Sequence, residues 1–230
     1  DVYKRQIFIP ANKLDWITKT FERGADSIIL DLEDSVTETH KKQAREDLYL
    51  HLIDNKYEGN LIVRVNPIDQ DLGLEDIKKL TDTDLSIDAF MVPKIEDSSF
   101  LSKLPEINVI PLLETPRSIQ NIADIASQSR VKGLALGGAD LSASLGSTMD
   151  WDSLLYARSK IILEASINNL FSIDSPFMDI NDLESLEKES KKSKSLGFDG
   201  KAAIHPNQLE VIQKSFLPSD EEIKEAKNII

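Results

Sequence analysis

The sequence predicts a single α/β domain with the fold of a (β/α)8 TIM barrel. Eight short runs rich in Ile, Val, Leu and Phe recur along the 230 residues. These runs lack strict alternation of apolar and polar residues, which is typical of parallel strands buried on both faces. Amphipathic stretches of helical period lie between them, and strands that alternate with helices favour parallel pairing with right-handed crossovers. Eight such units in this length indicate a closed barrel.

The elements follow one another in a regular order. The predicted strands are 7–10, 27–33, 61–66, 89–94, 109–114, 133–137, 170–174 and 200–205, and the clearest helical stretches are 14–23, 37–55, 152–169 and 182–196. Gly24 and Gly197 follow the first and last of these helices as stop signals. A doubly wound open sheet is the alternative fold. Neither a Gly-x-Gly-x-x-Gly turn nor a phosphate-binding P-loop follows any strand, which disfavours it.

Composition excludes several classes of protein. Lys and Arg number 27 against 40 Asp and Glu, a formal charge of −13, so neither nucleic acid nor an anionic membrane is expected as the main partner. The absence of Cys excludes disulfides, zinc–thiolate sites, Fe–S clusters and thiol catalysis, and it fits a cytoplasmic protein. No apolar run approaches the roughly 20 residues that a membrane-spanning helix needs.

Charged residues gather where the predicted strands end. In a barrel these carboxyl ends surround the active site. The residues found there are Asp31, Glu33, Asp34, Arg64, Asn66, Lys94, Glu114 and Asp140. Oxygen ligands without Cys, in a chain with three His, suit a hard cation such as Mg²⁺. We therefore expect Glu114 and Asp140 to supply metal ligands, with Arg64 and Lys94 offsetting the negative charge.

Each of these residues also has a purely structural interpretation. Asp34 is as easily a cap of the following helix, whereas Thr115 and Ser118 are better placed than Glu114 to cap the next one. Gly138 precedes Asp140 in a Gly-Gly pair, which favours either an anion-binding nest of N–H groups or close packing of a strand against a helix. His205 precedes a proline in an extended segment and is as readily structural as catalytic.

Ordered motifs run from Arg5 to about Ala226. The most specific are Leu30-Asp31-Leu32-Glu33-Asp34, Val63-Arg64-Val65-Asn66, Leu113-Glu114-Thr115-Pro116, Gly138-Ala139-Asp140-Leu141, Asp174-Ser175-Pro176 and the Gly200-Lys201 to Ile204-His205-Pro206 segment. Together they resemble the citrate lyase beta-subunit-like branch of the HpcH/HpaI aldolase superfamily. The resemblance covers nearly the whole chain.

The resemblance implies a Mg²⁺-dependent carbon–carbon lyase. Its substrate would be a citryl-, malyl- or citramalyl-CoA type of thioester, cleaved to or formed from an acyl-CoA and a 2-oxo acid. It implies that Glu114 and Asp140 bind the metal, that Arg64 binds the substrate carboxylate or thioester oxygen, and that Asp31 and Glu33 orient the site. The residues that it places against substrate or CoA are Arg5, Arg64, Gly138, Ala139, Lys201 and His205.

The resemblance also implies features outside the barrel itself. Family lyases continue into a lid after the last barrel helix, so we expect residues 1–230 to form one barrel domain without it, with residues 218–230 beginning a linker helix. A homo-oligomer, either trimer or hexamer, is expected on the same ground. Two other functions stay open at this point: a metal-dependent aldolase of free 2-oxo acids, and a lidless binding module or inactive subunit of a larger complex.

Overall fold

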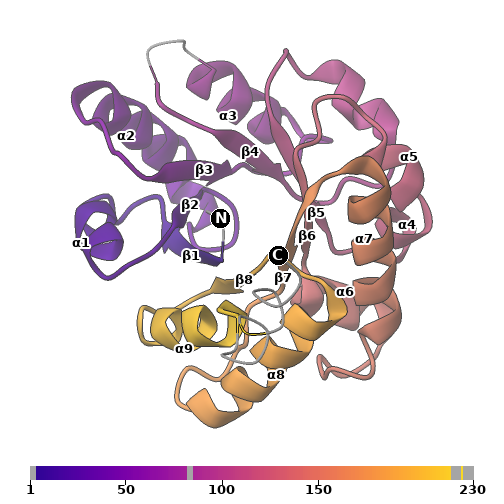
Figure 1. The fold of residues 1–230 in the computed structure, drawn as a ribbon. Helices are drawn as coiled ribbons and strands as arrows, with labels where there is room; N and C mark the ends of the chain where they lie inside the picture. Colours follow the sequence, from indigo (N-terminus) through magenta and orange to yellow (C-terminus); the bar gives the residue numbers. More distant parts are fainter. Residues whose placement is uncertain (1–3, 82–84, 219–223, 225–230) are drawn as a thin grey trace.

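Eight parallel strands close into a barrel in the computed structural model, which describes residues 4–81, 85–218 and 224. The strands follow chain order around the barrel, and β1 pairs with β8 to close it (Figure 1). They are β1 (Arg5–Pro10), β2 (Ser27–Asp31), β3 (Asn60–Arg64), β4 (Ala89–Val92), β5 (Val109–Leu113), β6 (Gly133–Leu136), β7 (Phe171–Asp174) and β8 (Gly200–Ala203). The predicted (β/α)8 barrel is confirmed, and the open sheet is excluded.

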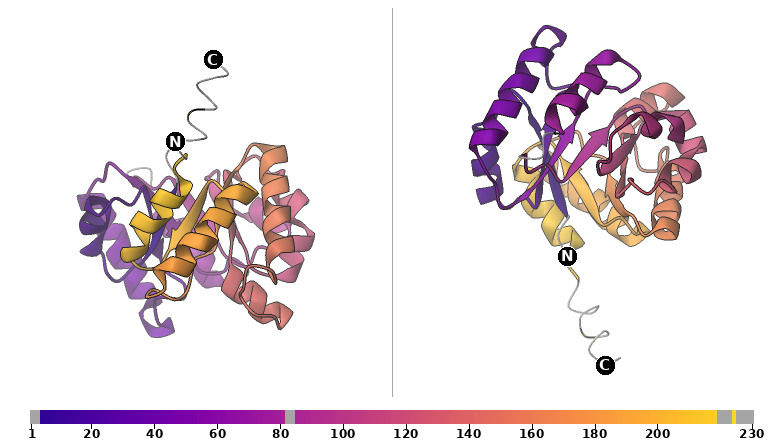
Figure 2. Two further views of the ribbon diagram at one scale, coloured as in Figure 1. Left: turned by 60° about the horizontal axis from the view of Figure 1, so that its bottom comes forward. Right: turned by 90° about the horizontal axis from the view of Figure 1, so that it is seen from above.

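Helices surround the strands (Figure 2). They are α1 (Trp16–Glu22), α2 (Lys41–Asp54), α3 (Asp71–Leu80), α4 (Pro116–Gln120), α5 (Ile122–Ala126), α6 (Gly138–Leu145), α7 (Leu155–Asn168), α8 (Leu183–Leu196) and α9 (Asn207–Phe216), with 3₁₀ helices η1 (Glu38–His40) and η2 (Ser98–Lys103). The four predicted helices correspond to α1, α2, α7 and α8. Within the described part of the chain, no helix is both long and apolar enough to cross a membrane. The linker helix predicted at 218–230 lies almost wholly outside the described residues.

Strand alternation divides the apolar side chains into two sets. One set fills the barrel interior and consists of Ile29, Ile62, Ala89, Met91, Ile110, Leu112, Ala135, Ile173 and Ala202, with Phe8 and Phe171 beside them. The other, which includes Ile28, Leu30 and Leu48, fills the layer between strands and helices. Side chains two residues apart on a strand share a face. The inward direction of Ile29 and Ile62 therefore also sends the last residues of β2 and β3 into the mouth of the barrel.

Candidate active site

A cavity of about 360 Å³ opens where the strands end at their carboxyl termini. Its apolar wall contains Phe8, Met91, Leu112, Ala135, Ile173 and Ala202, and its charged wall contains Asp31, Asp34, Arg64, Glu114, Asp140 and Asp174. A largely apolar pocket with a few converging polar groups is typical of a small-molecule site. Most of the carboxylates predicted at the strand ends therefore face one cavity.

Arg64 is held firmly at one side of this cavity. It stands opposite Asp31 in the register of β2 and β3. Its Nε and Nη2 donate to the two Asp31 carboxylate oxygens at 2.7 and 2.6 Å, and the guanidinium carbon lies 5.0 Å from the centre of the Phe8 ring. A two-pronged bond of this kind fixes the plane of the guanidinium. Asp31 thus orients Arg64, which agrees with the orienting role that the family resemblance implies for it.

The pKa of each partner follows from this contact. Burial alone would raise the pKa of the Asp31 carboxyl, but the hydrogen bonds and charge of Arg64 outweigh burial and hold it below its usual value. Asp31 also accepts the backbone N–H groups of Glu33 and Ser35, at 3.0 and 3.1 Å. Burial would lower the pKa of Arg64, and the neighbouring carboxylates raise it instead. The pair is therefore ionised across the ordinary pH range.

Glu33 is buried without a hydrogen bond to either carboxylate oxygen. Its oxygens lie 3.3 Å from Arg64 Nη1 and 3.4 Å from Lys94 Nζ. Burial raises the pKa of Glu33 to about 7, because these two cations only partly offset the loss of water. Near neutral pH this side chain can hold or release a proton beside Arg64.

Glu114 follows β5 and is only 3 % exposed. Its Oε1 accepts the backbone N–H of Lys94 at 3.0 Å. A Cβ atom on Gly137 would lie 2.7 Å from Oε2 and 2.5 Å from Glu114 Cβ, so only glycine leaves room for this carboxylate. Burial, together with the charges of Glu33 and Asp140, raises the pKa of Glu114 to about 8.

Asp140 completes the predicted pair of ligands. It is exposed in the first turn of α6, lines the cavity, and is close enough to raise the pKa of Glu114. Among residues 4–81 and 85–218, no three His, Asp or Glu side chains are grouped so that they could hold a metal together. Two carboxylates completed by water and substrate oxygens nevertheless suit Mg²⁺, which keeps several waters in its octahedron. The excess of negative charge around Glu114 also fits a divalent cation.

The helix caps settle two of the structural alternatives. Thr115 Oγ1 accepts the N–H of Ser118 at 3.0 Å, and Ser118 Oγ accepts that of Thr115 at 3.2 Å. This capping box leaves the Glu114 carboxylate unused by the helix, as predicted. Asp34 makes no cap and lies 3.2 Å from Arg64 Nη1 instead.

Gly138 and Ala139 line the cavity from the start of α6. A Cβ on Gly138 would lie 2.8 Å from Ser175 Oγ and 3.1 Å from Met149 Cε. A larger residue here would have to displace these side chains, so the segment is closely packed against Ser175 and Met149. The backbone N–H groups of a first helical turn have no acceptor within the helix. The same segment can thus also receive an anion.

A family model described as HpcH/HpaI aldolase/citrate lyase matches residues 4–206. The chain belongs to this family. It is 30 % identical to the citrate lyase subunit beta of Leuconostoc mesenteroides subsp. cremoris, over 99 % of this chain and 81 % of that protein. It is 31 % identical to the mitochondrial citramalyl-CoA lyase of Homo sapiens, over 97 % and 74 % of the two chains.

The fold of this HpcH/HpaI family member is shared with solved structures. The CitE protein of Mycobacterium tuberculosis, in complex with magnesium, acetoacetate and coenzyme A, superposes with a TM-score of 0.89 at 30 % identity. The match covers 99 % of this chain and 86 % of that one. The resemblance seen in the sequence motifs is confirmed, and membership supports the prediction of an enzyme of carbon–carbon bond chemistry.

Arg5 does not reach the cavity. It is the first residue of β1, at the end of the barrel opposite the carboxyl ends. Its guanidinium donates to both Asp26 carboxylate oxygens, at 2.7 and 3.1 Å, and to Gln213 Oε1 at 2.8 Å. Arg5 therefore ties β1 to Asp26, just before β2, and to α9. Its expected contact with substrate or CoA stays a prediction.

Lys201 lines neither this cavity nor the adjoining one that contains His205. It precedes Ala202, whose side chain faces the barrel interior, so Lys201 points outward toward α8 and is fully buried. Its Nζ donates to Asp174 Oδ2 at 2.9 Å, the Ser175 carbonyl at 2.7 Å and Glu189 Oε1 at 2.7 Å. The expectation that Lys201 meets CoA stays a prediction, which these buried contacts do not favour. Its ammonium has carboxylate and carbonyl partners inside the protein.

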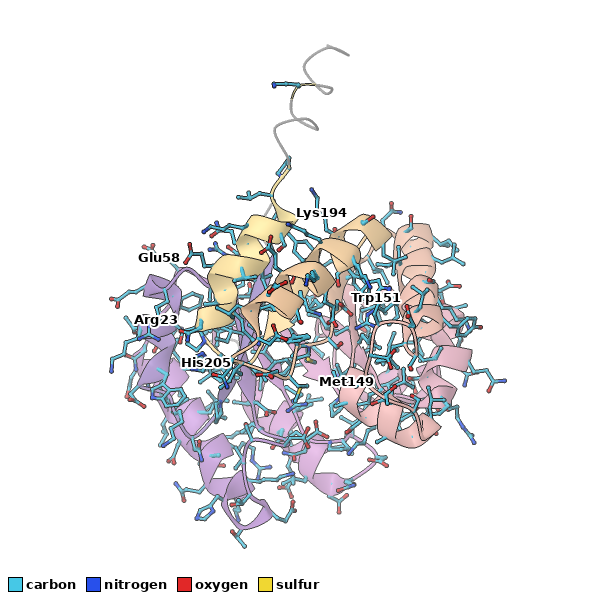
Figure 3. All side chains as sticks on the ribbon, turned by 90° about the horizontal axis from the view of Figure 1, so that it is seen from below. Arg23, Glu58, Met149, Trp151, Lys194 and His205 are labelled. Atoms are coloured by element: carbon cyan, nitrogen blue, oxygen red, sulfur yellow. The ribbon has the colours of Figure 1, made fainter. Side chains whose placement is uncertain are left out.

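His205 lies in the segment between β8 and α9 (Figure 3). It lines a second cavity of about 400 Å³. Trp16 and Lys19 of α1, and Arg23 directly after that helix, line the same cavity. Phe8, Pro10 and Ile204 line both cavities, so the two adjoin. Of the three residues expected at the CoA end, His205 alone faces an open space.

Several residues that line the first cavity could not be assigned a function from the sequence. Asp174 lines the first cavity while its carboxylate is bonded to Arg158 and Lys201. Met149, labelled in Figure 3, reaches the cavity from the segment between α6 and α7. The inward alternation of β1 could have identified Phe8. No pattern in the sequence points to Met149.

The metal-free protein is expected to lose stability as the pH rises from about 5 to about 8. The pKa of a glutamate in the unfolded chain is near 4.5, whereas burial raises the pKa of Glu33 to about 7 and that of Glu114 to about 8. Between these values the folded chain binds more protons than the unfolded chain, so its free energy of unfolding falls with rising pH. Urea unfolding in EDTA at four pH values measures this. A free energy of unfolding that stays level or rises would contradict it, and Glu114→Gln should reduce the slope.

Proposed function

We propose that the chain is a Mg²⁺-dependent lyase that cleaves, or in reverse forms, a carbon–carbon bond in a 3-hydroxyacyl-CoA thioester. One observation carries the proposal: a single cavity gathers two carboxylates suited to Mg²⁺, Glu114 and Asp140, together with the fixed cation Arg64. Substrates of the citryl-, malyl- or citramalyl-CoA type present a carboxylate, a hydroxyl and a thioester within a few bonds. The two relatives described above are named as a citrate lyase subunit and a citramalyl-CoA lyase, which agrees with this type of reaction.

Glu114 and Asp140 would hold the metal, and the acid end of the substrate would complete its ligands. When bound, Mg²⁺ supplies Lewis-acid polarisation of the substrate oxygens. The N–H groups of Gly138 and Ala139, at the start of α6, are placed to receive the substrate carboxylate. The apolar wall of the cavity excludes water from this end of the substrate.

Arg64 would act on the thioester end. Loss of the hydroxyl proton turns the C–O bond into the carbonyl of the 2-oxo acid, and the electrons of the broken C–C bond pass to the thioester as an enolate. Addition of a proton to its carbon gives the acyl-CoA. Arg64 N–H groups aimed at the thioester oxygen stabilise this charge as it develops. Asp31 keeps the guanidinium in one orientation, so little reorganisation accompanies the step.

The CoA end of the substrate would extend into the second cavity. The two cavities share Phe8, Pro10 and Ile204 in their walls, so the ligand would pass over the end of β1 to reach the second one. There Lys19 and Arg23 supply positive charge for phosphates in a chain of formal charge −13. Trp16 offers an aromatic face for a base, and His205 lies beside it. A long ligand with an anionic, aromatic end suits this arrangement better than a free 2-oxo acid does.

Incubation of the purified chain with malyl-, citramalyl- or citryl-CoA and Mg²⁺ tests the proposal. We expect an acyl-CoA and a 2-oxo acid to form in equal amounts, and EDTA to stop the reaction. Release of free CoA without a 2-oxo acid would indicate thioester hydrolysis and contradict the proposal. Turnover of the free hydroxy acids alone would favour an aldolase, and no turnover of any thioester would favour a binding module.

A further inference from the structure

Lys94 has a left-handed backbone, with φ of 54°. In the described part of the chain only Asn169 shares a positive φ among non-glycine residues, and it ends α7, where that conformation is common. Lys94 follows Pro93 after β4 and ends no helix. A lysine held left-handed is strained, and strain of this kind is concentrated at functional sites.

The conformation directs one backbone donor at the site. The N–H of Lys94 reaches Glu114 Oε1 at 3.0 Å. The other oxygen, Oε2, lies on the side of Gly137, which caps the helix that carries Asp140. The hydrogen bond therefore decides which carboxylate oxygen faces Lys94 and which faces α6.

The backbone N–H of Lys94 orients Glu114, whereas its side-chain ammonium group would oppose the binding of a cation. Its Nζ is 3.4 Å from Glu33 Oε1, and the side chain is 46 % exposed. An ammonium group beside a cation site repels the cation, so the side chain cannot account for metal binding here. Backbone and side chain can consequently be tested separately.

We propose that Lys94 is a positioning residue whose left-handed backbone, and not its ammonium group, orients Glu114 to bind Mg²⁺. The inference rests on the proposed function, because it assumes that Glu114 is a metal ligand. The N–H of Lys94 bonds Oε1, and Oε2 lies beside Gly137 at the start of the helix that carries Asp140. Without that donor, the buried carboxylate would lose its fixed orientation.

Lys94→Gly and Lys94→Val form a matched pair, since both remove the ammonium group. Glycine adopts the left-handed conformation freely, whereas for β-branched valine it is an outlier. We expect the Gly variant to bind Mg²⁺ at least as tightly as the unaltered chain, because a repelling charge is lost. The Val variant should bind Mg²⁺ about tenfold more weakly than the Gly variant. Calorimetric titration of the whole chain with Mg²⁺ measures both dissociation constants.

Equal Mg²⁺ affinity in the two variants, with the Val variant merely less stable, would overturn the inference. If the Val variant does not fold, Lys94→Asn and Lys94→Ala replace the pair, because asparagine tolerates the left-handed region better than alanine. Tighter binding by the Asn variant then supports the inference, and equal binding overturns it. An unaltered chain that binds no Mg²⁺ would refute the proposed metal site itself, which distinguishes the two failures.

Discussion

Replacement of Glu114 by glutamine is expected to lower kcat/KM for the CoA thioester by about a thousandfold, because a metal ligand that supplies several kcal/mol is lost. Glutamine has nearly the same shape as glutamate, so Lys94 N–H can still donate to the remaining carbonyl oxygen. Calorimetric titration should show Mg²⁺ binding greatly weakened. Asp140→Asn is expected to lower kcat/KM and weaken Mg²⁺ binding in the same way, because it removes the other proposed metal ligand.

The same substitution is expected to stabilise the metal-free protein at pH 8. Burial and two nearby carboxylates raise the pKa of Glu114 to about 8, so a neutral side chain removes an unfavourable charge. Asp76→Asn is the matched control: burial raises the pKa of Asp76 too, but its carboxylate accepts hydrogen bonds from Arg45 and Asn66, which asparagine cannot all replace. The control should lose stability and keep its Mg²⁺ affinity. Full activity in both Glu114→Gln and Asp140→Asn would refute the ligand assignment.

Arg64→Lys is expected to lower kcat about a hundredfold or more. Loss of one preoriented donor at a developing oxyanion typically costs this much. Lysine keeps the charge beside Asp31 but lacks the planar fork that bonds both carboxylate oxygens. Arg64→Ala is less informative, because it leaves buried carboxylates unpaired and should cost about 3 to 5 kcal/mol of stability.

Arg45→Lys supplies the control for this experiment. Arg45, on α2, is a buried arginine whose two carboxylate partners, Glu75 and Asp76, do not line the cavity. We expect it to lower the melting temperature without changing kcat. If Arg64→Lys and Arg45→Lys reduce kcat by the same factor, the loss reflects folding and Arg64 has no special place in the reaction.

The fold and the central charges could be predicted because both follow from local patterns. Buried parallel strands have apolar runs, and residues at their carboxyl ends necessarily share one face of the barrel. Asp31, Arg64 and Glu114 were therefore identifiable from their positions alone. The caps at Thr115 and Ser118 were equally local, so the structural interpretation of Glu114 could be discounted in advance.

Side-chain direction and backbone strain were harder to predict. Arg5 and Lys201 belong to motifs shared with the family, yet one lies at the amino end of its strand and the other on the outward face. Strand boundaries one residue apart reverse that face, and sequence locates them only loosely. The left-handed conformation of Lys94 has no local signal, because lysine does not prefer it. Met149 reaches the cavity through a long connection whose path depends on packing.

The pairing of β1 with β8 has a consequence for how the protein folds. Gln6 pairs with Ala202 and Ile7 with Ala203, although roughly 200 residues separate the partners in sequence. All the other strand pairs of the barrel join strands that are consecutive in sequence. Contacts of such long range carry the largest loop-closure entropy and slow the search for the native state. Phe8 and Ile204 stand on either side of this seam and line both cavities. The wall shared by the two cavities is thus completed only when β8 pairs with β1, although Asp31, Arg64, Glu114 and Asp140 all precede that strand in the chain.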